Sequence, residues 1–132
     1  MATLDVQVSI DAPAVDRAMV ASGDRCEQLA RALEFRDTTA IESTAEHAVN
    51  VWLAGREAYW RLLVRYSSGS MLVKDARGRL HAAFRQTLEL LSQATCVVDA
   101  PETYDVLIDL GGTLMRAMSH PSVLINYRRR QG

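Results

Sequence analysis

The chain has 132 residues, of which 48% are hydrophobic and 23% are charged, and its net charge is −1 at pH 7. This size and composition are typical of one globular domain with a single core, and they exclude the basic field with which nucleic-acid-binding proteins attract phosphate. With no signal peptide and no apolar run of membrane length, we expect a cytoplasmic protein that binds neither nucleic acid nor membrane. We predict one domain over residues 1–127 and a basic, solvated tail over residues 128–132.

The first predicted element is a strand over residues 4–10, in which Leu, Val, Val and Ile alternate with polar residues. A period of two is typical of a strand with one buried face. Asp11 is expected to cap the helix that follows, with Pro13 in its first turn. That helix is predicted from a stripe with helical spacing, formed by Val15, Met19, Ser22, Cys26, Leu29 and Leu33.

A second helix is predicted to begin at Asp37 or Thr38, either of which can cap it, and to end at Gly55. Its packed stripe consists of Ile41, Ala45, Ala48 and Trp52. Glu46 and Asn50 are four residues apart and roughly opposite that stripe, so they share one face outside the core. A carboxylate that can orient water, one turn from an amide oxygen that can ligate Mg²⁺, suits nucleotide chemistry. An ordinary solvated helix face has the same pattern.

Residues 60–75 predict a β-hairpin, because two apolar runs flank a turn-forming segment, Ser67-Ser68-Gly69-Ser70. A third helix follows, with a stripe at Leu80, Phe84, Leu88, Leu91 and Ala94.

Pro101 restarts the chain, and a fourth helix is predicted from the stripe at Leu107, Leu110, Leu114 and Ala117. Gly111 and Gly112 are unfavourable inside a helix, so a break or a functional turn is expected there. Met115 and Met118, at helical spacing, are expected in the core rather than in a groove for a partner. Alternation over residues 123–127 predicts a closing strand.

The predicted order is therefore β-α-α-β-β-α-α-β. Few, hairpin-like strands and paired helices are typical of a two-layer α+β sandwich, in which a mostly antiparallel sheet carries the helices on one face.

Three segments carry a resemblance to a known family: the helix of Glu46 and Asn50, the hairpin that ends at Asp75, and the Gly-Gly-Thr over residues 111–113. Their layout resembles the ATP-binding domain of the gyrase, histidine-kinase and MutL (GHKL) superfamily. Within it, the layout most resembles the small anti-sigma-factor serine kinases of bacterial partner-switching systems.

The resemblance implies a role for each matching residue. Glu46 would be the catalytic base, and Asn50 would ligate the Mg²⁺ that accompanies ATP. Asp75 would accept a hydrogen bond from the adenine amino group, with Gly78 the one glycine after it. The phosphates would lie on the backbone of Gly111, Gly112 and Thr113.

The chain also departs from the family pattern. Arg77 and Arg79 replace the two glycines that let the backbone approach the base, and no glycine-rich lid lies between Asp75 and Gly111. We therefore expect a bacterial regulatory protein with impaired nucleotide binding, which acts by binding a protein partner rather than as an enzyme.

Two other functions stay open. One is an active serine kinase that uses ATP, Mg²⁺, Glu46 and Asn50. The other is an unrelated small α+β domain that binds a ligand or self-associates as a homodimer, with the apolar stripes over residues 15–33 and 80–94 as its surfaces.

Overall fold

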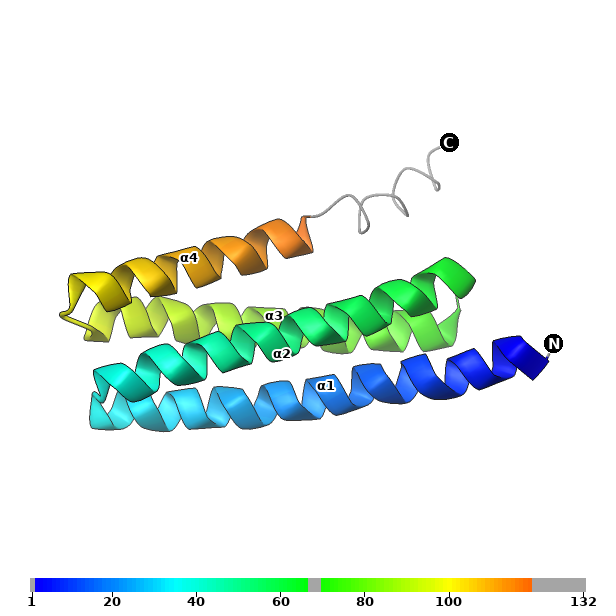
Figure 1. The fold of residues 1–132 in the computed structure, drawn as a ribbon, viewed down its shortest axis with the longest axis horizontal. Coiled ribbons are helices and arrows are strands. Elements are labelled where there is room, and N and C mark those ends of the chain that lie inside the picture. Colours follow the sequence, from blue (N-terminus) through cyan, green and yellow to red (C-terminus); the bar gives the residue numbers. More distant parts are fainter. Residues whose placement is uncertain (1, 67–69, 120–132) are drawn as a thin grey trace.

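The computed structural model describes residues 2–66 and 70–119, with side chains described from residue 12 onward. These residues form helices and contain no strand (Figure 1). The helices are α1 (Ala2–Phe35), α2 (Thr38–Arg65), α3 (Met71–Val97) and α4 (Pro101–Met118). The predicted α+β sandwich is therefore wrong, and so is the GHKL ATPase-like layout that depended on a sheet.

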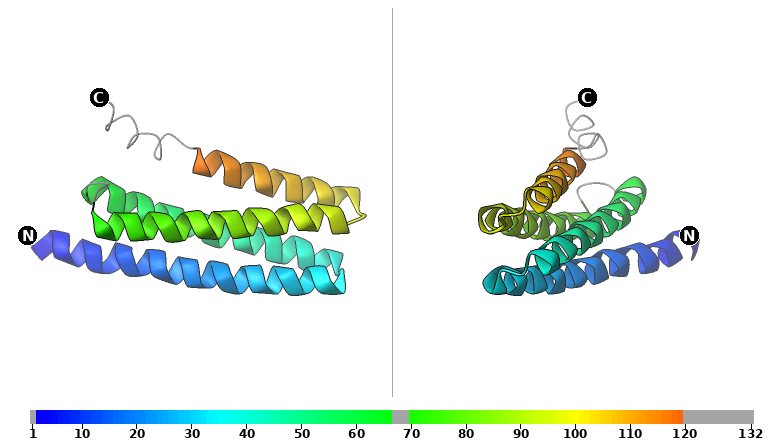
Figure 2. Two further views of the ribbon diagram at one scale, coloured as in Figure 1. Left: turned by 180° about the vertical axis from the view of Figure 1, so that it is seen from behind. Right: turned by 60° about the vertical axis from the view of Figure 1, so that its left-hand side comes forward.

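The four helices of the described residues form a bundle centred on α2 and α3. Helices α1, α2 and α3 pack against one another, and α4 packs against α2 and α3. Figures 1 and 2 show α4 on the side of α2 and α3 that faces away from α1. Because α4 is only 18 residues long, it covers part of the length of its neighbours.

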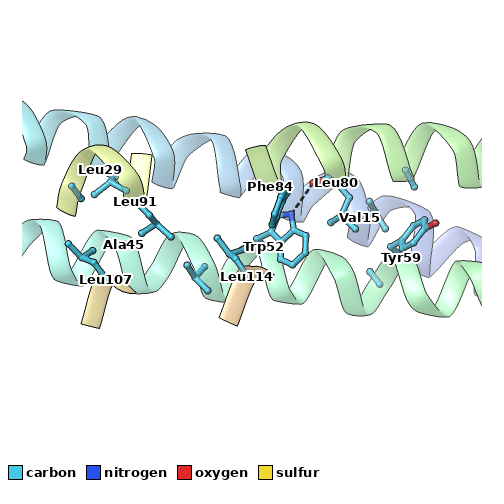
Figure 3. Close-up of a cluster of buried hydrophobic side chains, with 14 of the residues drawn as sticks. Val15, Leu29, Ala45, Trp52, Tyr59, Leu80, Phe84, Leu91, Leu107 and Leu114 are labelled. Atoms are coloured by element: carbon cyan, nitrogen blue, oxygen red, sulfur yellow. Dashed lines mark hydrogen bonds between the residues drawn. The ribbon is translucent and has the colours of Figure 1, made fainter. Parts of the chain in front are cut away.

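Trp52 lies at the middle of the core, and its side chain is fully buried (Figure 3). Its indole Nε1 donates a hydrogen bond of 2.9 Å to the backbone oxygen of Leu80, and its ring centroid lies 5.7 Å from that of Phe84. A buried indole N–H needs such an acceptor, because an unpaired polar group in the core is costly. Trp52 therefore ties α2 to α3 by both packing and a hydrogen bond.

The predicted stripes are confirmed where side chains are described. Ile41, Ala45, Ala48 and Trp52 are buried in α2, and Leu80, Phe84, Leu91 and Ala94 are buried in α3. The cap of α2 is also confirmed, because the Asp37 carboxylate accepts a hydrogen bond of 3.2 Å from the amide of Ala40. Pro101 begins α4, as its fixed φ angle favours.

The first predicted strand is wrong, because residues 4–10 lie inside α1. Pro13 is also inside α1 rather than in its first turn, so Asp11 does not cap the helix. Leu4, Val8, Ala12 and Val15 are separated by four, four and three positions, which is helical spacing. Two members of the alternating run, Leu4 and Val8, thus fit a helical period as well as a period of two.

The predicted hairpin is wrong for a similar reason. Gly55 does not end α2, residues 60–65 are its last turns, and residues 71–75 open α3. The buried stripe of α2 continues past Trp52 through Gly55, Tyr59 and Leu62 with spacing 3-4-3. A Cβ at Gly55 would clash with the side chain of Met19 of α1 and would lie 3.1 Å from the Cβ of Ala18. The small size of Gly55 therefore allows α1 to approach α2 closely.

The predicted break at Gly111 and Gly112 is also wrong, since both lie inside α4. Leu107 and Leu114 are buried on either side of them, so the packing of α4 outweighs the low helix propensity of the two glycines. The predicted closing strand over residues 123–127 lies outside the described residues.

Substitution of Gly55 and of Gly23 should change the free energy of unfolding in opposite directions. Gly55→Leu should lower the free energy of unfolding by about 1–3 kcal/mol, because the new side chain meets α1. Gly23→Ala should raise it by about 0.5–1 kcal/mol, because Gly23 is exposed and a Cβ there would have no described atom within 4 Å. Guanidinium unfolding followed by circular dichroism measures both. A Gly55→Leu variant as stable as wild type would contradict the close approach of α1 and α2.

Candidate functional site

Glu46 and Asn50, the predicted catalytic base and Mg²⁺ ligand, lie on α2 with exposed side chains. Their neighbours Ala45, Ala48 and Val49 are buried, so the predicted orientation of this pair away from the core is confirmed. A helix of this kind keeps one face in the core and leaves the other in solvent.

Asp75 and Gly78, predicted for the adenine pocket, are exposed on α3. Asp75 lines a cavity of about 110 Å³ between α1, α2 and α3. Two other charged residues of this cavity, Asp16 of α1 and Arg79 of α3, form an ion pair with each other. Arg79 thus links two helices in this fold, at a position where the family pattern has glycine.

The predicted phosphate loop, residues 111–113, is helical. Backbone amides inside a helix donate to the carbonyl one turn earlier, so they do not point at a ligand as those of a loop can. The hydroxyl of Thr113 likewise donates to the backbone oxygen of Asp109 at 3.0 Å. Gly111 lines a cavity between α3 and α4, which is separate from the cavity of Asp75.

These positions place Asp75 and Gly111 in different cavities and Glu46 and Asn50 on an exposed helix face. Within the described part of the chain, no group of three or more His, Cys, Asp or Glu side chains could hold a metal ion. The same part contains no helix with the length and apolar composition needed to cross a membrane.

The cavity between α3 and α4 has a mainly apolar lining. We call it the α3–α4 groove; it has a volume of about 340 Å³. Leucines at 88, 91 and 107 contribute its apolar surface. Its complete lining is Leu88, Leu91, Ser92, Thr95, Leu107, Ile108, Gly111 and Met115.

One wall of this groove belongs to a second stripe of α4. We call it the α4 stripe; it consists of Tyr104, Ile108, Gly111 and Met115. Its three large side chains are 45%, 49% and 50% exposed, respectively. Met115 is therefore not a core residue, contrary to the prediction. In the described residues the other large exposed apolar side chains are spread over α1, α2 and α3, at Val20, Phe35, Val64 and Met71.

The α4 stripe follows the buried stripe of the same helix by one position. Thr103, Leu107 and Leu114 face the core, and Tyr104, Ile108 and Met115 come next in the sequence. Since one residue turns a helix by about 100°, the second stripe emerges at the edge of the first, over the groove. The 4-3-4 spacing of Tyr104, Ile108, Gly111 and Met115 is the sequence signal that could have identified this surface.

A polar contact of Arg56 holds the end of α4 against α2. The guanidinium Nε of Arg56 donates a hydrogen bond of 2.9 Å to the backbone oxygen of Ala117. A carbonyl in the last turn of a helix lacks its usual amide partner four residues ahead, and a cation there also compensates the helix dipole. Arg56 thereby fixes the orientation in which α4 presents its stripe.

Comparison of the chain with protein-family models, with curated proteins and with solved structures finds no match.

Two adjacent residues of α4 should differ sharply in their contribution to stability. Leu107→Ala should lower the free energy of unfolding by about 2–5 kcal/mol, because Leu107 is buried. Ile108→Ala should change it by less than about 1 kcal/mol, because half of that side chain is exposed. Chemical unfolding at low protein concentration measures both. Equal losses would mean that the α4 stripe is part of the core rather than a free surface.

Proposed function

We propose that this protein is a cytoplasmic regulatory protein that acts by binding another polypeptide chain through the α4 stripe and the α3–α4 groove. The observation that carries the proposal is the exposure of Tyr104, Ile108 and Met115 along one line of α4. Contiguous apolar surface on a soluble domain is characteristic of an interaction site, whereas single exposed apolar residues are not.

A helix is the partner element that fits this surface best. The groove runs between two neighbouring helices, and an amphipathic helix binds such a groove by placing apolar residues every three or four positions along it. The side chains of the groove are mainly aliphatic, with Ser92 and Thr95 at one wall. Burial of this surface supplies affinity, and the charged residues at its rim supply specificity.

Substitution of Ile108 by glutamate tests the proposed surface. Wild-type protein, tagged and returned to the cells that produce it, should recover a polypeptide that the Ile108→Glu variant does not recover. Mass spectrometry identifies that polypeptide, which is either an untagged copy of this chain or another protein.

The matched control is Val20→Glu, which also places a charge at an exposed apolar position but on α1. This variant should recover the same polypeptide as wild type. If all three proteins recover the same set of polypeptides, the α4 stripe is not the binding surface.

Nucleotide binding by Glu46 and Asn50, and serine kinase activity with Glu46 as base, stay predictions. Titration calorimetry with ATP and Mg²⁺ decides between them and the proposed function. We expect no heat of binding. Saturable, Mg²⁺-dependent binding that Asn50→Ala abolishes would instead favour the kinase.

A further inference from the structure

The α4 stripe has the same spacing in both directions along the helix. Its residues, Tyr104, Ile108, Gly111 and Met115, are separated by four, three and four positions. If a second α4 lies antiparallel to the first with the stripes aligned, Ile108 of each copy faces Gly111 of the other. Tyr104 of each copy then faces Met115 of the other. One two-fold axis relates both sets of contacts, as a symmetric dimer interface requires.

The sizes of the facing side chains are complementary in this arrangement. Glycine is unfavourable inside a helix, yet a Cβ at Gly111 would have no described atom within 4 Å. Packing within the chain therefore does not account for the missing side chain. In the antiparallel pair, Ile108 of the second copy fills the gap at Gly111. The sulfur of Met115 meets the ring of Tyr104, a favourable contact for methionine.

The charges beside the stripe are complementary as well. Asp105 and Gly112 each follow a stripe residue by one position, so both lie on the outer edge of the stripe. The guanidinium of Arg116 lies over Gly112, with Nη1 3.2 Å from the place that a Cβ would occupy. Antiparallel pairing brings this guanidinium near the Asp105 carboxylate of the other copy.

The same features disfavour a parallel pair. In a parallel pair, Asp105 of one copy and Arg116 of the other would lie on opposite sides of the interface and eleven positions apart along it, so the attractive pairs would be lost. Parallel helices would also place Gly111 against Gly111, which leaves the gap unfilled, and Ile108 against Ile108. Asp109 is exposed and lies farther round the helix from the stripe than Asp105 does.

From these observations we infer that a second copy of this chain covers the α4 stripe, and that the two copies form a dimer through antiparallel α4 helices. This inference rests on the proposed function, because it names the polypeptide chain that the stripe binds. Ile108, Gly111 and Met115 also line the α3–α4 groove together with residues of α3, so the interface includes α3.

Charge reversal tests the antiparallel pairing. Asp105→Arg and Arg116→Asp should each weaken the dimer of the purified full-length chain about tenfold, because two attractive pairs become repulsive. The double variant, Asp105→Arg with Arg116→Asp, should restore wild-type affinity. An equimolar mixture of the two single variants should also dimerise, since the charges then match across the interface. Sedimentation equilibrium over a range of concentrations measures all four samples.

Gly111→Leu separates dimer formation from folding. The variant should raise the midpoint of unfolding of the monomer at low concentration, because leucine favours the helix and a Cβ there has no described atom within 4 Å. It should weaken the dimer at least about tenfold, because it fills the space that Ile108 of the second copy needs. A variant that dimerises as well as wild type would overturn the inference.

The outcomes also distinguish failure of the inference from failure of the proposed function. A wild-type chain that is monomeric at every concentration overturns the inference, and so does a dimer that does not respond to both single charge reversals or is not restored by the double one. The proposed function survives such a result if Ile108-dependent capture recovers a different protein. It fails together with the inference if Ile108→Glu changes neither capture nor self-association.

Discussion

The continuous buried stripe of α2 is the constraint on which the rest of the structure depends. Helix α2 packs against α1, α3 and α4, so its sides must fit three neighbours at once. Trp52 fills the centre and donates a hydrogen bond to Leu80 of α3, whereas Gly55 leaves room for α1. Arg56, the next residue, holds the end of α4. About one turn of α2 thus positions its three neighbouring helices. Trp52 bonds to α3, the absence of a side chain at Gly55 lets α1 approach, and Arg56 bonds to α4.

The sequence was sufficient to identify most core positions but not the secondary structure around them. The stripes around Trp52 and Leu91 were predicted because helical spacing is a direct consequence of burying one face. The breaks at Gly55 and Gly111 were wrong because glycine lowers helix stability only modestly, and tertiary packing outweighs that cost. Whether a glycine ends a helix or admits a neighbouring one depends on residues far away in the sequence. In this fold Met19 of α1 supplies that contact for Gly55.

The candidate site could be predicted only in part for the same physical reason. That Glu46 and Asn50 face away from the core followed from their angle to the buried stripe, and the structure confirms it. That Asp75 and Gly111 line different cavities could not follow from their order in the chain, because the order of local signals does not determine which helices meet. The sequence shows the helical spacing of the α4 stripe. That the stripe is exposed depends on the burial of Leu107 and Leu114 in the core, which the spacing alone does not predict.

The proposed surface exists only if α2 remains one helix from Thr38 to Arg65 and α4 remains one helix through Gly111 and Gly112. Residue-resolved ¹³Cα chemical shifts of the purified protein in solution test this continuity most directly. The account predicts helical shifts without interruption across Gly55 and residues 60–65, and again across residues 107–117. Strand-type shifts over residues 60–65, or a loss of helical shifts at Gly111 and Gly112, would contradict it.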